Sequence, residues 1–330
     1  MQKSRLLMLI AGVGAALCQC AVWAQSPAAT FPNKPVTIVL PYTTGASTDI
    51  ETRLYMPRLM ENLGQPVLID YRPGAGSSLG TIYVSKAAPD GYTILSVTPG
   101  FSVYPAFFPL DKLPYDPIKD FAPISLVNKR TAIMLVHPSL GVKTFPEYLA
   151  YAKANPDKIN FGTSGGGGIF HIVGAWLHSA TNTRVTFIHY KGAGPMYVDF
   201  LAGRVNAAPG IPFVVAPYIK SGKLLPIAAM TAERSKYMPD LRTLVEYGVT
   251  DYNYVSWSGL LAPARTPEAI VNRWSAAFAF VARAPEVIKK MEVDSAEMVG
   301  TTPEQFRQSL AVEVARWRRV VQENNIRLED

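Results

Sequence analysis

The segment VTIVLPYTTGASTDIETRL, at residues 36–54, places a strand pattern, a short turn and a helix pattern in immediate succession. Val36–Leu40 is an apolar, β-branched run that stops before Pro41, and apolar residues recur at helical spacing from Ile50 onward. The turn between them, TTGASTD at residues 43–49, is rich in small hydroxyl side chains. A strand that leads through a tight turn into a helix is typical of an α/β fold. The unpaired N–H groups at such a helix start can also bind an anion.

The same alternation continues along the chain. Eight apolar runs are predicted strands: Val36–Leu40, Val67–Tyr71, Tyr92–Val97, Ala132–Val136, Lys158–Phe161, Val185–His189, Leu224–Ala229 and Tyr254–Leu261. Helical patterns separate them, and two more helices close the chain. The first of these is predicted to be capped by Thr266, and the second by the capping box at residues 302–305. Strands separated by helices predict parallel sheets covered on both faces.

The first 24 residues have the pattern of a secretory signal peptide. Two basic residues precede an apolar run at residues 6–17 and the small-residue pattern Val22-Trp23-Ala24. Cys18 and Cys20 leave with this segment, so the mature chain has no thiol for a disulfide, a zinc site or catalysis. No later segment is apolar over the roughly 20 residues that a membrane helix needs. We therefore expect a soluble, exported protein.

Length and charge limit the function classes. Removing 24 of the 330 residues leaves 306, which favours two domains over a single core. The net charge of +7 becomes +5 when Lys3 and Arg5 leave with the signal peptide. The densest basic cluster is at Arg316, Arg318 and Arg319, and no nucleic-acid-binding motif accompanies it. We expect that cluster to be a solvated helix face.

Three glycine-rich turns each follow a predicted strand and precede a predicted helix: TTGASTD (43–49), PGAGSSLG (73–80) and TSGGGGIFH (163–171). Ligands of open parallel sheets bind beyond the carboxyl ends of strands, where such turns collect. The second turn spaces its glycines as G-x-G-x-x-x-G, one residue too long for a dinucleotide fingerprint, and no acid follows at the expected distance. We therefore expect no nicotinamide or flavin cofactor.

The third turn also matches G-x-S-x-G, the nucleophile elbow of α/β-hydrolases, with Ser164 at its centre. In those enzymes an acid and then a histidine follow the serine, whereas no acid lies between Ser164 and the last histidine, His189. A triad of another order, using His171 or His189 with Asp199, stays open. An exported serine hydrolase is therefore the alternative interpretation.

Metal binding has little support in the sequence. His171 and His178 are about two helical turns apart, but no acid or cysteine lies close enough in sequence to complete a zinc site. We expect no metal and hydrogen-bonded structural histidines. For His171, in the first turn of its helix, ligand contact and a structural role are equally favoured.

Six segments resemble, in the same order, the substrate-binding receptors of tripartite tricarboxylate transporters, also called Bug or TctC-type proteins. The segments are YTTGASTDIETR (42–53), GQPVLIDYRPGAGSSLGTIYVSKAAPDGYTIL (64–95), LPYDPIKDFAPIS (113–125), INFGTSGGGGIFH (159–171), IHYKGAGP (188–195) and SWSGLLAPARTP (256–267). The resemblance covers about residues 31–326 of the chain. Several motifs in a fixed order are far more specific than any single one.

The resemblance implies a two-lobed α/β periplasmic binding protein, type II-like, that closes on a small organic carboxylate and delivers it to a membrane permease. One lobe would comprise residues 25–129 and 251–330 and the other residues 130–250, joined by hinge strands near 128–130 and 249–252. It further implies a periplasmic monomer with no cofactor, no enzymatic activity and no nucleic-acid partner. A sensory protein that presents its ligand to a membrane kinase uses the same lobes and is a further alternative.

Receptors of this family hold the ligand carboxylate through backbone groups and hydroxyls in the turns that correspond to residues 42–49 and 163–171. The ligand-binding residues implied here are Tyr42, Gly45, Ala46, Ser47, Thr48, Asp49, Thr163, Ser164, Gly165, Gly166, His171 and Tyr190. Ser47 and Thr48 are expected beside the ligand, and one of the three residues 47–49 is expected to cap the helix. Asp49 is expected to organise the turn, because its charge would repel an anion, and Lys191 is expected to be solvated.

Four positions depart from the family's usual pattern. Ala46 replaces a glycine, Gly168 a hydroxyl residue, Gly210 a frequent aspartate and Tyr42 a common phenylalanine. The missing aspartate removes the natural partner of a ligand ammonium group, so an amino-acid ligand is disfavoured. The glycines at 168 and 210 predict a larger cleft, and hence a bulkier or more apolar carboxylate such as an aromatic acid.

Overall fold

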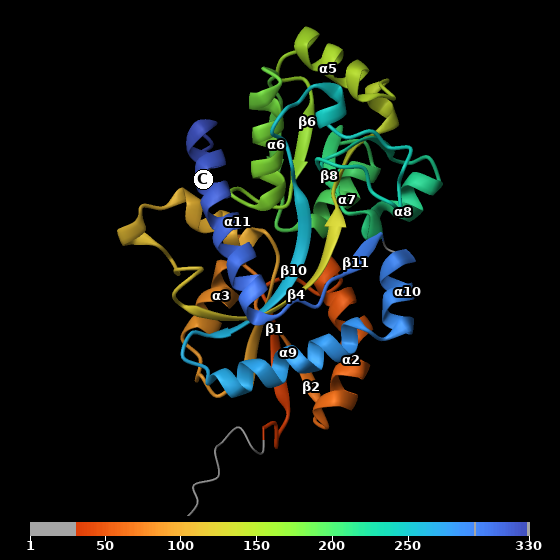
Figure 1. The fold of residues 1–330 in the computed structure, drawn as a ribbon. Coiled ribbons are helices and arrows are strands. Elements are labelled where there is room, and N and C mark those ends of the chain that lie inside the picture. Colours follow the sequence, from red (N-terminus) through yellow and green to blue (C-terminus); the bar gives the residue numbers. More distant parts are fainter. Residues whose placement is uncertain (1–30, 294, 329–330) are drawn as a thin grey trace, which may run out of the picture.

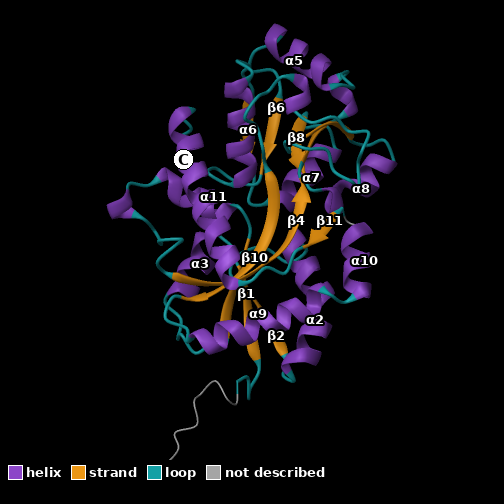
Figure 2. Ribbon diagram, viewed as in Figure 1, coloured by secondary structure: helices purple, strands orange, loops and turns teal. Residues whose placement is uncertain are grey.

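The computed structural model describes residues 31–293 and 295–328, and the expected signal peptide lies outside them. The described chain forms two α/β parts, one above the other in Figure 1, and each is built on its own β-sheet. Figure 2 shows the strands of both sheets in orange with helices around them. We call them the six-strand part and the five-strand part.

The six-strand sheet has the strand order β11-β4-β10-β3-β1-β2. Its strands are β1 (Val36–Leu40), β2 (Val67–Tyr71), β3 (Thr93–Val97), β4 (Phe121–Thr131), β10 (Val255–Pro263) and β11 (Ala296–Met298). β1 is parallel to β2 and β3, whereas β10 is antiparallel to both β3 and β4, and β11 is antiparallel to β4. The sheet is therefore mixed.

Helices cover both faces of the six-strand sheet. On one face its buried side chains pack with α2 (Ser47–Leu63), α9 (Glu268–Ala282) and α10 (Pro285–Val293). On the other face they pack with α3 (Ser78–Ser85), α4 (Gly100–Val103) and the first half of α11 (Pro303–Glu323). Short 3-10 helices lie in connections, at Ala75–Ser77, Tyr104–Phe107, Leu110–Lys112, Pro138–Leu140 and Val245–Tyr247.

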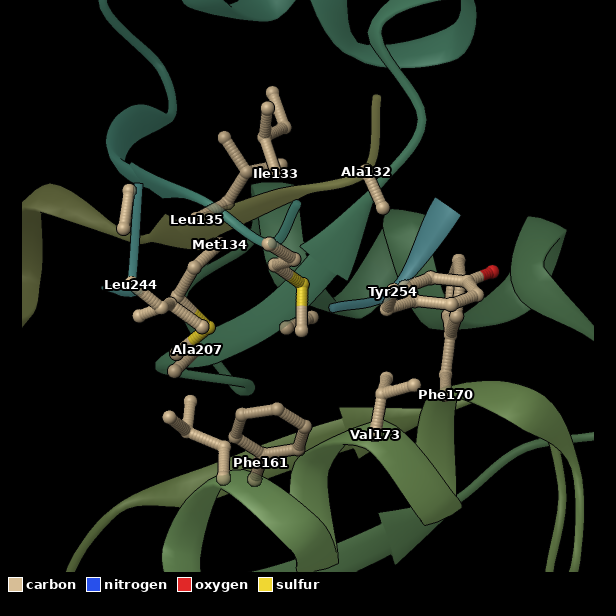
Figure 3. Close-up of a cluster of buried hydrophobic side chains, with 14 of the residues drawn as sticks. Ala132, Ile133, Met134, Leu135, Phe161, Phe170, Val173, Ala207, Leu244 and Tyr254 are labelled. Carbon is tan, nitrogen blue, oxygen red and sulfur yellow. The ribbon is translucent and has the colours of Figure 1, made fainter. Parts of the chain in front are cut away.

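The five-strand sheet has the strand order β7-β6-β8-β5-β9. Its strands are β5 (Ile133–Val136), β6 (Asn160–Thr163), β7 (Thr186–His189), β8 (Ala207–Gly210) and β9 (Leu225–Ala229), and the helices of this part are α5 (Phe145–Ala154), α6 (Ile169–Ala180), α7 (Ala193–Leu201) and α8 (Pro212–Lys220). β5 is antiparallel to β8 and β9, and β6 is parallel to β7 and β8. Figure 3 shows part of the core, where Tyr254 lies beside Phe170 and Val173 of α6.

Two chain crossings join the parts. β4 ends at Thr131 and β5 begins at Ile133, so a single residue, Ala132, separates them. On the return path, Met230 N–H donates to the Ala132 carbonyl at 2.8 Å, and Tyr254 N–H donates to the Met230 carbonyl at 2.7 Å. The lobe boundaries at 129/130 and 250/251, and the hinge positions, stay predictions.

The C-terminal helix α11 packs against both parts. Its predicted capping box is confirmed, because Gln305 N–H donates to the Thr302 hydroxyl at 3.2 Å and Thr302 N–H donates to the Gln305 side chain at 3.0 Å. Phe306, near the start of the helix, is buried in the core of the six-strand part. Trp317, near its end, is buried against Trp176 in the core of the five-strand part. α11 is therefore a third connection between the parts.

The α/β class is confirmed, whereas the prediction of purely parallel sheets is wrong. The chain enters the five-strand part on one strand and returns on another, so β4 and β10 must run in opposite directions. The predicted cap of α9 is also wrong, since its N-cap is Pro267 and the buried Thr266 hydroxyl has no hydrogen-bond partner among the described residues. Within those residues, no helix has both the length and the apolar character needed to cross a bilayer.

A buried histidine gives this fold a pH-dependent stability. His178 lies in the core of the five-strand part, with Nε2 3.2 Å from the Tyr148 hydroxyl and Nδ1 2.7 Å from the Thr183 hydroxyl. Burial lowers the pKa of His178 to about 3. The unfolded chain has a pKa of about 6.5, so this stabilisation is fully present above that pH and is lost as the pH falls toward the folded pKa. We expect the free energy of unfolding to fall by about 2 kcal/mol between roughly pH 6.5 and pH 5.

Urea unfolding at several pH values measures this loss. In the His178→Phe variant, the free energy of unfolding should fall by about 2 kcal/mol less between the same two pH values, because the titrating imidazole is gone. His137→Gln is the control for the loss of a histidine, because His137 is only partly buried and does not belong to this core. Equal pH dependence in the wild type and His178→Phe would contradict the prediction.

Candidate functional site

The strand directions bring two sets of turns to facing edges of the sheets. β4 leads into β5, so the carboxyl end of β4 and the amino end of β5 lie where the two sheets meet. β1, β2 and β3 run in the direction of β4, and β6, β7, β8 and β9 run opposite to β5. The carboxyl ends of all these strands therefore point toward the other sheet, which is where ligands of open α/β sheets bind.

The turn between β1 and α2 is organised by Asp49. Its buried carboxylate accepts a hydrogen bond from Gly45 N–H at 2.8 Å, from the Tyr71 hydroxyl at 2.6 Å and from Arg53 Nε at 2.8 Å. Burial raises the pKa of the Asp49 carboxyl, but these three hydrogen bonds outweigh it and hold the pKa below its usual value. Gly45 has a φ of +80°, a conformation that favours glycine. Asp49 therefore has a structural role, because its carboxylate holds the turn in place.

No side chain caps the start of α2. Its N-cap is Ala46, which makes no side-chain hydrogen bond, so the expectation that Ser47, Thr48 or Asp49 is the N-cap residue is wrong. Among the described residues, the N–H groups of Ser47 and Thr48 have no backbone partner, and the buried Thr48 hydroxyl has no partner either. The first turn of α2 therefore has unpaired donors next to the edge of the sheet.

Tyr42 lies beside this turn and contacts the end of β3. Its hydroxyl is 2.8 Å from the Thr98 hydroxyl and accepts a hydrogen bond from Thr98 N–H at 3.1 Å. Burial raises the pKa of Tyr42, so the phenol stays neutral. Burial, with smaller contributions from Glu313 and Tyr42, also raises the pKa of Tyr254. Tyr254 in turn packs beside Phe170 in α6 (Figure 3). Because Tyr42 acts on Tyr254, the end of β1 lies near the start of α6.

The turn between β6 and α6 is held by histidines. The Thr163 hydroxyl is 2.6 Å from His189 Nδ1, and Gly167 N–H donates to His171 Nδ1 at 3.1 Å. The His171 ring is buried against Phe187 and His189, at centroid distances of 5.0 and 4.8 Å. These contacts give His171 a structural role in fixing the glycine turn, while its contact with a ligand stays a prediction.

Like α2, α6 begins without a side-chain cap, because its N-cap is Gly168. Gly168 N–H donates to the Gly165 carbonyl at 3.1 Å, but the N–H groups of Ile169 and Phe170 have no backbone partner among the described residues. Ser164, Gly165 and Gly166 are half-buried on the same turn. Both facing helices thus begin with unpaired amide donors.

Tyr190 and Asp199 bond to each other. The Tyr190 hydroxyl donates to Asp199 at 2.8 Å, and Arg204 pairs with the same carboxylate at 2.7 Å. Burial and the bond to Asp199 raise the pKa of Tyr190 to about 12. Tyr190 and Arg204 thus engage the Asp199 carboxylate, which disfavours Asp199 as the orienting acid of a Ser164 triad. Lys191 is exposed.

The two glycines that differ from the family's usual pattern, Gly168 and Gly210, do not enlarge a cleft. A Cβ atom at Gly210 would lie 2.4 Å from Leu135 Cδ1, so a neighbouring core side chain already fills that space. A Cβ atom at Gly168 would lie 3.1 Å from the Gly165 carbonyl oxygen, which is also tight. The prediction that these two glycines enlarge the cleft for a bulky or aromatic ligand is therefore wrong.

One buried network next to the turns was missed by the sequence analysis. Glu51, on α2, pairs with Arg130 on β4 at 2.6 Å, and both side chains are at most 4% exposed. The same carboxylate accepts hydrogen bonds from Asn128 on β4 and Ser258 on β10. Glu51 thus ties α2 to both strands that cross between the parts. The sequence signal was an acid on the helix face that carries Tyr55 and Leu59, which are buried.

The chain is similar to one protein family and to several known proteins. A family described as the tripartite tricarboxylate transporter family receptor matches residues 52–326. BugT of Bordetella pertussis is 29% identical over 321 residues, which are 97% of this chain and 98% of BugT. Two structures from Rhodopseudomonas palustris are also similar. Rpa4515 with adipate is 31% identical with a TM-score of 0.84 and covers 90% of this chain and 99% of its own. MatC with bound malate is 29% identical with a TM-score of 0.82 and covers 88% of this chain and all of its own.

The chain belongs to the tripartite tricarboxylate transporter receptor family. The resemblance stated from the sequence and the periplasmic-binding-protein fold are both confirmed. The site residues themselves stay predictions. Among residues 31–293 and 295–328, no three His, Cys, Asp or Glu side chains gather in a group that could hold a metal ion.

Proposed function

We propose that this protein is a periplasmic receptor that captures a small organic carboxylate between its two parts and delivers it to a tripartite transporter. The expected signal peptide supports export, and the receptor family supports capture without chemistry. One structural observation carries the proposal: two helices without side-chain caps begin at facing sheet edges, after β1 and after β6.

A carboxylate between these two helix starts would accept hydrogen bonds from unpaired main-chain N–H groups. Each helix start also carries roughly half a positive charge from the aligned peptide dipoles. The ligand charge is then neutralised without a lysine or arginine in the two turns, which contain neither residue. Asp49 and His171 hold these donors in place through Gly45 and Gly167. Helix N-termini bind phosphate and other anions in the same way in many proteins.

The ligand we propose is a small aliphatic acid without an ammonium group. The crowded surroundings of Gly168 and Gly210 remove the reason for an aromatic acid. The family's frequent aspartate at position 210 is glycine in this chain, so the partner that the resemblance implies for a ligand ammonium group is absent, which disfavours an amino acid. Two similar proteins of Rhodopseudomonas palustris, MatC with bound malate and Rpa4515 with adipate, have ligands of the proposed chemistry.

A thermal-shift screen with malate, adipate, benzoate and aspartate tests the function. An acid present at about 100 times its Kd stabilises the protein by about 2.7 kcal/mol, which raises the melting temperature by roughly 5 °C or more. We expect this shift with an aliphatic diacid and none with aspartate. Small-angle scattering with the same acid should show a smaller radius of gyration, as expected for domain closure around a ligand. A shift with aspartate alone would refute the ligand class, and no shift with any of a broad set of organic acids would refute the receptor.

A further inference from the structure

The segment that follows α11 packs against the glycine turn between β6 and α6. A Cβ atom at Gly167 would lie 2.2 Å from Leu328 Cδ2 and 3.6 Å from Phe107 Cε2. Both side chains therefore lie where a side chain at position 167 would be. Gly167 also has a φ of +69°, a conformation that favours glycine. The glycine thus lets Leu328 and Phe107 pack directly on the main chain of the turn.

This turn needs support from outside because its own residues offer little. Residues 165–168 are four consecutive glycines, and glycine loses more conformational freedom on folding than any other residue. Gly168 N–H donates to the Gly165 carbonyl at 3.1 Å, and Gly167 N–H donates to His171 Nδ1 at 3.1 Å. Glycines have no side chain that could pack into the core. The packing of Leu328 and Phe107 therefore adds to these two hydrogen bonds in limiting the motion of the turn.

A Schellman motif at the end of α11 fixes the direction of the segment that carries Leu328. Asn325 has a φ of +49°, and its N–H donates to the Gln322 carbonyl at 3.3 Å. Ile326 N–H donates to the Val321 carbonyl at 3.0 Å, which completes the pair of hydrogen bonds that defines the motif. Ile326 and Val321 are both buried in the core of the five-strand part. Leu328 therefore follows a firmly anchored residue at a distance of two positions.

Phe107 reaches the same turn from the six-strand part. It is the last residue of the 3-10 helix at Tyr104–Phe107, which directly follows α4, and its half-buried ring packs against the core of the five-strand part. Figure 1 shows the end of α11 beside α6, and the rings of Trp317 and Trp176 on these helices are 6.1 Å apart between centroids. The glycine turn is thus in contact with elements that are anchored in both parts of the fold.

We propose that Leu328 and Phe107 are positioning residues that hold the turn at residues 163–168 in one conformation. In that conformation the unpaired N–H groups of Ile169 and Phe170 face the carboxylate of the bound acid. This inference rests on the proposed function, because it assigns a role in the same carboxylate site. A loop that must be ordered on binding lowers the affinity. Packing that orders the turn in the free protein removes this cost, although neither side chain touches the acid.

Hydrogen exchange of the protein without added ligand tests whether Leu328 holds the turn. In Leu328→Ala the hydrogen-bonded amides of Gly167 and Gly168 should exchange roughly tenfold faster than in the wild type, because the turn opens more easily. Leu328→Met nearly conserves the side-chain volume and should keep the wild-type rate. Arg327→Ala is the matched control, since Arg327 is the exposed neighbour in the same segment, and it should also keep that rate. Melting curves check that all variants fold.

Titration calorimetry with malate and with adipate tests the link to binding. For an acid that binds the wild type, the Kd should rise roughly five- to tenfold in Leu328→Ala and in Phe107→Ala. It should stay unchanged in Leu328→Met and Arg327→Ala. Unchanged exchange in Leu328→Ala overturns the proposal, and so does faster exchange with an unchanged Kd. If the wild type binds neither acid, that result counts against the ligand class proposed above, and the exchange rates alone decide whether Leu328 holds the turn.

Discussion

Replacing Glu51 by leucine is expected to lower the free energy of unfolding by about 3 to 5 kcal/mol. The substitution leaves the Arg130 guanidinium buried with no opposite charge, and it removes the acceptor of both Asn128 and Ser258. An uncompensated buried charge is far more costly than the loss of a surface pair. Urea unfolding followed by circular dichroism measures the change. This is the largest stability effect that we expect from a single substitution in the described residues.

The double variant Glu51→Leu, Arg130→Met separates the charge from the packing. When both ions of a buried pair are replaced by apolar side chains, the change is often neutral or stabilising. We therefore expect the double variant to recover most of the stability that Glu51→Leu loses. Glu61→Leu is the control on the same helix, because the Glu61–Arg58 pair is exposed and should contribute at most about 1 kcal/mol. A double variant that is less stable than Glu51→Leu would argue against this explanation.

The strands that the sequence predicted best are those with local signals. Val36–Leu40 and Val67–Tyr71 were predicted with the bounds they have in the structure, because Pro and Gly residues end apolar, β-branched runs there. β4 was missed, since Pro123 and the polar run Asn128-Lys129-Arg130 argue against a buried strand. Those polar residues are tolerated because Glu51 comes from a different segment of the chain to bind them. A partner 77 or 79 residues away leaves no local pattern.

In the candidate site, too, contacts between residues distant in sequence could not be predicted. The position of the turns could be predicted, because a strand followed by glycines and a helix places its turn at the edge of the sheet. The partners of the turn residues could not. Asp49 bonds Tyr71 at the end of β2, and Thr163 bonds His189 at the end of β7. These contacts depend on which strands are neighbours in the sheets, which residue spacing does not reveal.

Replacing Ser47 by proline is expected to weaken binding of the carboxylate ligand by about 10- to 100-fold. Proline at the first residue of a helix removes one N–H donor and leaves the helix intact. The preceding residue, Ala46, has φ −65° and ψ 158°, which is the extended conformation that a following proline requires. The lost donor would be one that bonds a charged group, and such a bond contributes about 1.5 to 3 kcal/mol.

The same substitution at two other helix starts makes the experiment specific. Ile169→Pro changes the first residue of α6, where Gly168 has φ −73° and ψ 164°, and it should weaken binding by a similar factor. Glu268→Pro makes the same change at the first residue of α9, which packs against α2 and the six-strand sheet. It should leave the affinity for the ligand unchanged. Titration calorimetry with the acid found in the thermal-shift screen measures all three variants. If Ser47→Pro and Ile169→Pro bind as tightly as Glu268→Pro, main-chain amides do not hold the ligand, and side chains of the two turns must do so instead.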